Sequence, residues 1–223
     1  MKGSDVYAVL MQKGISHLHH ANTVTTSCSF LTVGGLVSRG HAVQQGLPQT
    51  PQYSDPLDQQ FGIWYDIFTD TVDIHERASR RNYYGPVLFV LDPAILLSLP
   101  PGSDVLVTKK NPTKWVNGEQ ASDRYFQTPF ELSMFLSRGT FDQMITFRTP
   151  TGYIPFAGKH TEIVLDNPQG ALQNGSNAYT AGEAKLRNAA SASGIKVTIS
   201  QRTCNPNCKC LGQYASQHLD PLF

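Results

Sequence analysis

The stretch that decides the fold is TGYIPFAGKHTEIVLDNP, which runs from Thr151 to Pro168. A turn-rich loop leads directly into the short apolar segment Ile163–Leu165. This segment is too short for a helix and is rich in β-branched residues, so it predicts a strand with Glu162 at its first position. A carboxylate at the mouth of a buried strand is held rigidly and loses hydration, which suits it to stabilise a developing positive charge. The alternative is an exposed glutamate at a strand end.

The bulk composition indicates a single domain of ordinary charge. The chain has 223 residues, a formal net charge of +1 and four cysteines. This length favours one domain over residues 1–223, with residues 201–223 as a cysteine-containing tail. The apolar runs are too short to span a bilayer, and the first residues do not read as a signal peptide. We therefore expect a cytoplasmic protein with no membrane partner, in which any nucleic acid would bind a local patch.

Three histidines lie close together near the start of the chain. The alternation in Ile15–Asn22 places His17 and His19 on one face of a strand and Leu18 on the other, with His20 beginning the exit. A metal site would need a further ligand nearby. The alternatives are surface or core-edge histidines and histidines that bind a ligand.

A small-residue helix over Ser27–Thr32 is expected to stop at the glycine pair Gly34–Gly35. Arg39 follows on a tight connection. It is either a solvated surface arginine or an anion clamp, because a guanidinium can grip phosphate with two hydrogen bonds.

The middle of the chain combines an aromatic segment with a basic one. Phe61–Phe68 is predicted as an aromatic strand, and the charged segment Asp70–Asn82 holds Arg77, Arg80 and Arg81 just before Tyr83 and Tyr84. Arginines beside tyrosines suit phosphate contact and base stacking in single-stranded nucleic acid. An ordinary solvated loop is the alternative.

The remaining elements indicate the fold class. Gly85–Leu91 predicts a buried strand, Met144–Phe147 and Ile195–Ser200 predict two more, and Asp92–Pro93 begins a short helix. Short strands and a few helices without regular βαβ alternation indicate an α+β fold.

Two capping boxes account for glutamates that could otherwise be catalytic. Thr128 with Glu131, and Thr180 with Glu183, carry the spacing of a reciprocal helix cap. We therefore discount Glu131 and Glu183 as catalysts.

The tail contains Cys204, Cys208 and Cys210, with His218 beyond them. Four such ligands could hold zinc, but the spacing is not that of a standard finger, so we predict no metal site. The sequence lacks the P-loop, dinucleotide-binding, zinc-protease and serine-hydrolase motifs.

Three segments together resemble the ADP-ribosyltransferases of the His-Tyr-Glu kind, and within them the DarT-type DNA ADP-ribosyltransferase toxins of bacteria. They are HLHHANTVTTSCSFLTVGGLVSRG from His17, FGIWYDIF from Phe61, and the stretch from Thr151 to Pro168. The resemblance covers roughly residues 10 to 200. It implies a split β-sandwich with short helices and NAD as a substrate.

The resemblance also implies roles for individual residues. Glu162 would be the catalytic carboxylate, and His17 would hydrogen-bond the ribose next to nicotinamide. The second histidine of this site is either His19 or His20. One departure is His160, which stands two residues before Glu162 where many relatives carry Gln or Glu.

Other cofactor and acceptor contacts are implied in the same way. Tyr65 would stack on nicotinamide, with the Tyr83–Tyr84 pair competing for that role, and Arg39 would contact the diphosphate or ribose. The loop Arg148–Lys159 would face the acceptor. The residues implied to bind NAD are His17, His19, Asn22, Arg39, Tyr65 and Tyr84, and those implied to bind the acceptor are Arg80, Arg81, Arg148, Tyr153 and His160.

The resemblance thus implies transfer of ADP-ribose from NAD to a nucleic-acid base, with single-stranded DNA as the first candidate. The protein would be a bacterial toxin or defence effector with an antitoxin that removes the modification. The alternatives are an RNA or protein acceptor, and a non-catalytic nucleic-acid-binding domain.

Overall fold

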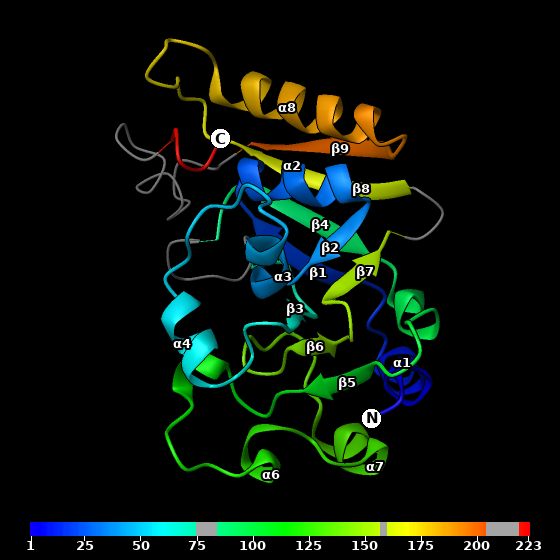
Figure 1. Ribbon diagram of the computed structural model, residues 1–223. Coiled ribbons are helices and arrows are strands. Elements are labelled where there is room, and N and C mark those ends of the chain that lie inside the picture. The colour runs from blue at the N-terminus through cyan, green and yellow to red at the C-terminus, as the bar shows by residue number, and fades with distance from the viewer. Residues whose placement is uncertain (75–83, 157–159, 204–218) are drawn as a thin grey trace.

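The computed structural model describes residues 1–74, 84–156, 160–203 and 219–223 (Figure 1). Helices and strands are both short, apart from α8, β8 and β9. The elements, in chain order, are α1 (Gly3–Gln12), β1 (Leu18–Asn22), α2 (Val24–Val33), β2 (Gly35–Val37), α3 (Arg39–Gln44), α4 (Asp55–Gln60), β3 (Ile67–Thr69), β4 (Val87–Leu91), the 3-10 helix η1 (Pro93–Leu97), β5 (Asp104–Val107), the 3-10 helix η2 (Pro112–Lys114), α6 (Ala121–Arg124), α7 (Pro129–Phe135), β6 (Ile145–Arg148), β7 (Tyr153–Pro155), β8 (His160–Asn167), α8 (Ala178–Ala192) and β9 (Lys196–Thr203).

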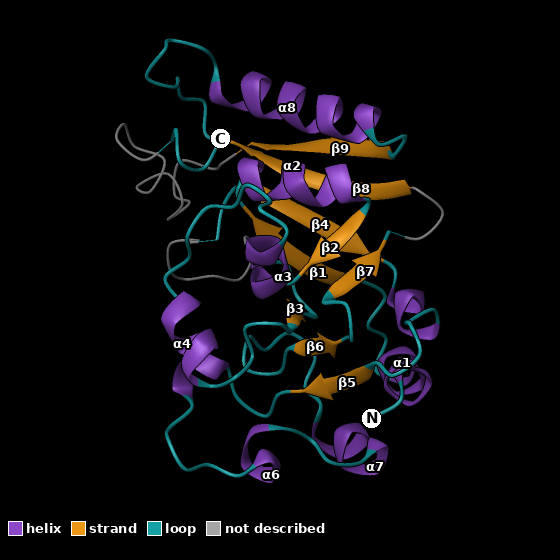
Figure 2. Ribbon diagram, viewed as in Figure 1, coloured by secondary structure: helices purple, strands orange, loops and turns teal. Residues whose placement is uncertain are grey.

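The largest sheet has the strand order β1-β4-β8-β9 (Figure 2). β1, β4 and β8 pair antiparallel, whereas β9 pairs parallel to β8 after the crossover through α8. Alternation along each strand places one set of side chains on a common face, and Phe89, Ile163 and Leu165 on that face are at most 1% exposed. We call this the covered face; α2 lies in front of it in the view of Figure 2.

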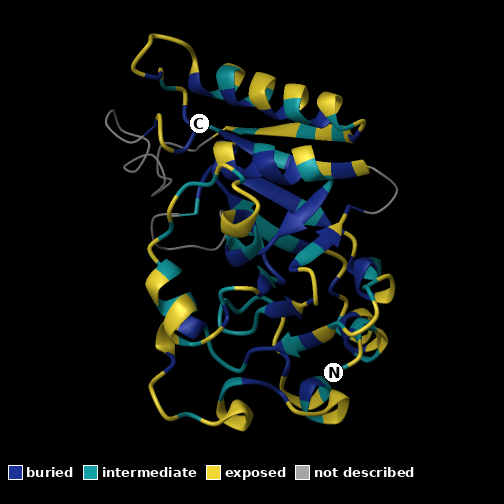
Figure 3. Ribbon diagram, viewed as in Figure 1, coloured by how far each residue is buried: buried dark blue, intermediate teal, exposed yellow. Residues whose placement is uncertain are grey.

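Two smaller sheets complete the α+β fold. β2 pairs with β7, and β3, β6 and β5 form a three-stranded sheet. An isolated bridge joins β1 to the residue after β3, because the N–H groups of His19 and Asp70 each donate to the other's carbonyl at 2.8 Å. One continuous hydrophobic core includes residues of all three sheets, such as Leu36, Phe89 and Phe147 (Figure 3). The α+β class is confirmed, and the split β-sandwich stays a prediction.

The predicted strand over Phe61–Phe68 is wrong for most of its length. Only Ile67–Thr69 forms a strand, and the segment before it turns at Gly62, whose φ is +70°. The backbone N–H of Ile63 donates to the carbonyl of Asp58, so this segment closes helix α4 instead of joining a sheet. Tyr65 therefore lies in a connection.

The predicted strand at Ile163–Leu165 is correct but too short. β8 spans eight residues, so Glu162 is its third residue and not its first. Glu162 is also exposed, contrary to the expected loss of hydration at a strand mouth. The physical reason is the pleat, which points Glu162 away from the covered face while Ile163 points into it.

The two expected capping boxes have different outcomes. Thr128 caps α7 as predicted by accepting from the N–H of Glu131, but the Glu131 carboxylate accepts from the N–H of Gln127, one residue before the cap, and not from the cap amide. The box at Thr180 and Glu183 is wrong, because α8 begins earlier and Asn177 caps it. At the end of α2, Gly34 takes the left-handed conformation with φ +80°, as the expected glycine stop requires.

Candidate active site on the outer face of the main sheet

The face opposite the covered face, here called the outer face, carries a row of side chains that crosses four strands. Directly paired residues share a face of a sheet. The register places His19 opposite Val90, Val90 opposite Glu162, and Glu162 opposite Thr198. His19 and Glu162 are therefore separated by one intervening strand, which corresponds to about 10 Å between their backbones.

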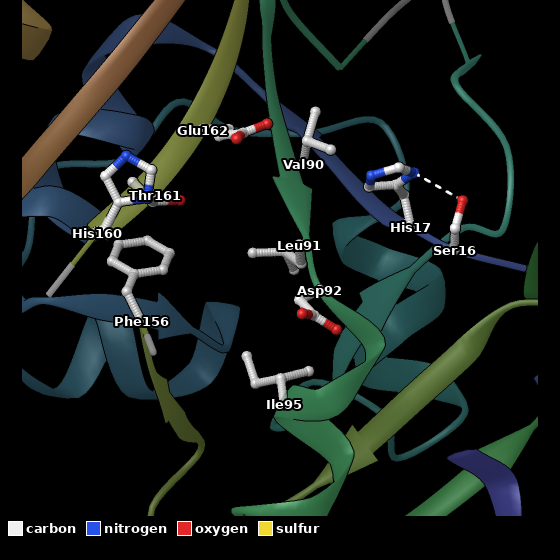
Figure 4. Close-up of a pocket in the computed structure, with 10 residues that line it drawn as sticks. All are labelled: Ser16, His17, Val90, Leu91, Asp92, Ile95, Phe156, His160, Thr161 and Glu162. Atoms are coloured by element: carbon white, nitrogen blue, oxygen red, sulfur yellow. Dashed lines mark hydrogen bonds between the residues drawn. The ribbon is translucent and has the colours of Figure 1, made fainter. Parts of the chain in front are cut away.

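A pocket of about 410 Å³ lies where β4 ends and β8 begins (Figure 4). Its apolar side chains come from the end of β4, η1 and the residue after β7. Its polar ones come from the residues before β1, from β8, and from Asp92 between β4 and η1. The described residues that line it are Ser16, His17, Val90, Leu91, Asp92, Ile95, Phe156, His160, Thr161 and Glu162.

His17 and Glu162 meet at this pocket, although 145 positions separate them in the chain. His17 precedes β1 and is exposed, and its ring lies 6.4 Å from that of His19. The predicted alternation is confirmed, because Leu18 between them is fully buried. Ser16 Oγ lies 3.0 Å from His17 Nδ1, a contact that orients the imidazole.

His160 also lies at the pocket, as the first residue of β8. It is exposed, and its Nε2 is 3.2 Å from Thr198 Oγ1. In register with His160 on the parallel strand is Lys196, an exposed cation on the outer face. Glu162 is thus flanked by a histidine, and a lysine lies one strand away.

His20 and Asn22 lie on the covered face, away from Glu162. The His20 ring packs against Phe30, and its Nδ1 is 2.7 Å from the Phe68 carbonyl. Loss of hydration on burial lowers the pKa of His20, and the charge of Arg39 acts in the same direction. Asn22 is buried, and its side-chain oxygen accepts from the N–H of Thr23 at 2.9 Å.

Arg39 is the first residue of α3, after the cap Ser38. Its Nε and Nη2 donate to the two carboxylate oxygens of Asp55 at 3.0 and 2.6 Å, and the guanidinium lies 5.8 Å from the centre of the Trp64 ring. Within the described residues, the buried Nη1 makes no hydrogen bond. Arg39 is therefore a fixed cation with one donor still available, and its charge acts on His20 of the covered face.

The two tyrosines predicted to contact NAD have different surroundings. Tyr65 is 44% exposed, accepts a hydrogen bond from Gln44, and meets the edge of His41. Burial raises the pKa of Tyr84 to about 12, and the charges of Asp70 and Asp58 add to the shift. Tyr65 and Tyr84 are not among the residues that line the pocket of Glu162.

The predicted acceptor residues outside the pocket are engaged with other groups. Arg148 donates to both oxygens of Asp66, at 2.9 and 2.7 Å. Burial raises the pKa of Asp66, and the Arg148 hydrogen bond opposes this. The Tyr153 hydroxyl contacts the carbonyls of Val33 and Gly34 at 3.2 and 3.1 Å, which ties β7 to the end of α2.

Several predictions lie outside the described residues, namely those for Arg77, Arg80 and Arg81, for Tyr83, for Lys159, and for Cys204, Cys208, Cys210 and His218. Within the described ranges, no three His, Cys, Asp or Glu side chains gather at metal-binding distance. Nor does any helix in those ranges combine the length and apolarity needed to cross a membrane.

The structure adds a residue that the sequence analysis missed. Thr161 is 4% exposed and lines the pocket, and its hydroxyl makes no hydrogen bond to any described residue. The sequence offers a weak signal for it: Thr161 stands at a position that alternates with Ile163 and Leu165, where an apolar residue would suit the covered face.

Comparisons with known proteins leave the family of this chain open. No family model matches the sequence, and no curated protein matches it. Among solved structures, the chain is similar to Thermus sp. 2.9 DarT in complex with ADP-ribosylated ssDNA. The TM-score is 0.48 and the identity is 10%, over 84% of this chain and 95% of that chain.

Proposed function

We propose that this protein is an NAD-dependent ADP-ribosyltransferase that modifies a base of single-stranded nucleic acid, with DNA as the first acceptor to test. The observation that carries the proposal is the convergence of His17, His19 and Glu162 on one side of the sheet, with Glu162 and His17 in one pocket. These are residues that the resemblance assigns to NAD binding and catalysis. His17 and Glu162 are 145 positions apart in the chain and come to one pocket only through folding.

The chemistry requires a fixed carboxylate beside a small binding pocket. Cleavage of the bond between nicotinamide and C1′ of the ribose leaves positive charge on C1′, and nicotinamide departs with the bonding electron pair. Glu162 stabilises that charge and then accepts the proton released when a nucleophilic atom of the acceptor forms its bond to C1′. The products are nicotinamide, the ADP-ribosylated acceptor and a proton.

The histidines place the other part of NAD. The separation of about 10 Å between the backbones of His19 and Glu162 leaves space over Val90 for a ribose and its leaving group. His17 and His19 bind the ribose hydroxyls. Arg39 is a weaker candidate for the diphosphate because Asp55 already engages it, so the diphosphate would have to replace that carboxylate.

The acceptor and the biological role follow from the same proposal. Arginines of the segment Asp70–Asn82 bind the phosphate backbone, and an aromatic side chain stacks on a base. The protein acts in the cytoplasm as a toxin or defence effector, and its partner is an antitoxin enzyme that removes ADP-ribose. The toxin role and the antitoxin partner both depend on which molecule is the acceptor, so the acceptor is tested first.

The test offers the purified protein NAD labelled in its adenosine part, with separate pools of single-stranded DNA, duplex DNA, RNA and protein. The expected result is label on single-stranded DNA, lost in Glu162→Gln and kept in the matched control Glu183→Gln. Glu183 is suitable because it lies on α8 and pairs with Arg187, away from the pocket. Label on RNA alone, or on protein alone, would show that this molecule and not DNA is the acceptor. Salt-sensitive DNA binding without any NAD cleavage would overturn the enzymatic proposal.

A further inference from the structure

We propose that Thr161 positions the acceptor base, by a hydrogen bond from its hydroxyl to the polar edge of the base. This inference rests on the proposed function and names a specificity residue that the motifs around Glu162 do not supply. Thr161 is 4% exposed, lines the pocket, and has a hydroxyl without a hydrogen-bond partner among the described residues.

A buried hydroxyl without a partner is unfavourable. Buried polar groups are nearly always hydrogen-bonded, and each exception calls for an explanation. Valine has almost the same shape as threonine and would satisfy this apolar surrounding better. The unpartnered hydroxyl of Thr161 therefore lowers the stability of the folded protein. A ligand in the pocket would supply the missing hydrogen-bond partner.

The other residues that line the pocket indicate the chemical class of that ligand. Leu91, Ile95 and Phe156 form an apolar wall, and Phe156 is stacked on Phe89 with ring centres 5.5 Å apart, which fixes its position. An apolar wall with a few polar groups suits a planar heteroaromatic ring, whose faces are apolar and whose edge forms hydrogen bonds. The carboxylates of Asp92 and Glu162 on the same pocket disfavour an anionic group there.

The position of the pocket assigns it to the acceptor base. Figure 4 shows Thr161 beside Glu162 on β8, with Phe156 and Ile95 farther along the pocket. Thr161 and Phe156 lie on the covered-face side and Glu162 lies on the outer face, but the pairing of β4 with β8 ends at Val90 and Glu162, so residues of both faces line the pocket at this strand end. A base that enters between the two strand ends, with one edge at Thr161, would present its nucleophilic atom to the Glu162 carboxylate that must take its proton. The nicotinamide ring is also a planar heteroaromatic ring with a polar edge. The experiment must therefore show which of the two rings, the acceptor base or nicotinamide, contacts Thr161.

The experiment compares Thr161→Val, Thr161→Ser and Thr146→Val with the wild type. Thr146 is a matched control because it is also fully buried with an unpartnered hydroxyl, but it lies on β6 and not at the pocket. Steady-state kinetics with a short single-stranded DNA give the KM of the acceptor. The rate of NAD hydrolysis without acceptor, and the inhibition of that hydrolysis by nicotinamide, show whether binding of the nicotinamide ring has changed.

The expected result is a rise of about 3- to 10-fold in the acceptor KM for Thr161→Val, the loss typical of one neutral hydrogen bond. NAD hydrolysis and nicotinamide inhibition should stay within twofold of the wild type. Thr161→Ser should keep the acceptor KM, and Thr146→Val should change none of these values. An unchanged acceptor KM in Thr161→Val overturns the inference. A rise in acceptor KM accompanied by an equal loss of nicotinamide inhibition also overturns it, because the hydroxyl would then not be specific to the base.

A second measurement keeps this inference separable from the enzymatic proposal. Binding of the four deoxynucleosides to the wild type and the three variants is followed by ligand-observed NMR, with no NAD present. Weaker binding in Thr161→Val alone supports a base site even if the wild type cleaves no NAD. Equal binding by Thr161→Val and the wild type, or binding by neither, contradicts it.

Discussion

His19 and His20 are neighbours in sequence but point to opposite faces of the main sheet. His19 shares the outer face with Glu162, whereas His20 packs on Phe30 and is held by the Phe68 carbonyl. This geometry favours His19 as the second histidine of the proposed NAD site and gives His20 a structural role.

We predict separate effects for the two histidines. His19→Ala should raise the KM of NAD about 3- to 10-fold, as expected for one lost ligand hydrogen bond. His20→Ala should lower the free energy of unfolding by roughly 1 to 3 kcal/mol, because it removes a packed ring and a hydrogen bond. Kinetics and urea unfolding of both variants check this, and the reverse pattern would assign the NAD role to His20.

Asp70 predicts a pH dependence of stability. Burial raises the pKa of Asp70 to about 7, whereas an aspartate in the unfolded chain has a pKa of about 3.9. Between these values the unfolded chain releases the proton and the folded protein keeps it. The contribution of Asp70 to the free energy of unfolding therefore falls from about pH 4 to about pH 7 and is constant above.

The variant Asp70→Asn should remove this pH-dependent penalty. Its free energy of unfolding should match that of the wild type near pH 4 and exceed it by roughly 2 to 4 kcal/mol at pH 8. Urea unfolding at several pH values between 4 and 8 measures the difference. A difference that does not grow with pH would show that Asp70 ionises normally in the folded protein.

At the scale of elements, β7 is held against the start of α3 by a close approach at Gly152. Its φ is +55°, its carbonyl accepts from the N–H of Ser38 at 2.8 Å, and an added Cβ would meet His41 Nδ1 and Ser38 Oγ. This approach aligns the segment that leads to Phe156 and the pocket.

We therefore predict that Gly152→Ala destabilises the protein by roughly 2 kcal/mol or more, from backbone strain and overlap together. Gly175→Ala is the matched control, because Gly175 has φ +83° but no atom within 4 Å of the added Cβ. It should cost only about 1 kcal/mol. Similar losses of Tm in the two variants would exclude steric overlap as the cause.

Helix α8 provides a second prediction about an element. Asn177 caps it by accepting from the N–H of Thr180 at 3.0 Å, whereas Glu183 pairs with Arg187 one turn along. Asn177→Ala should lower the free energy of unfolding by about 1 kcal/mol, and Glu183→Ala only by a few tenths. The denaturant midpoints of the two variants measure these losses of stability. A larger loss in Glu183→Ala than in Asn177→Ala would support the capping box that the sequence predicts.

At the scale of the molecule, local patterns predicted the elements better than their bounds. Apolar runs and turn residues located β4, β8 and β9, since these signals act over a few residues. The aromatic segment before Ile67 failed because a glycine turn and a hydrogen bond to α4 override its strand propensity. Strand propensity is a property of single residues and does not include the hydrogen bond between this segment and α4.

The candidate site was predictable only where it depends on short motifs. Glu162 and His17 were singled out as candidates from the segments that carry them. The histidine alternation predicted that His17 and His19 share a face, but it did not predict the face of Glu162. The buried hydroxyl of Thr161 and the roles of Leu91 and Ile95 depend on which strands pair with which. That information is not local in the sequence.

The most direct test of the central claim is the rate of ADP-ribose transfer from NAD to single-stranded DNA by the wild type and by Glu162→Gln. Glu162 is exposed, and its carboxylate makes no hydrogen bond or ion pair with any described residue, so the variant should fold normally with the same Tm. We predict a fall in kcat of about 10²- to 10⁴-fold, the range typical of a lost catalytic carboxylate. Transfer at the wild-type rate by the folded variant would contradict the account.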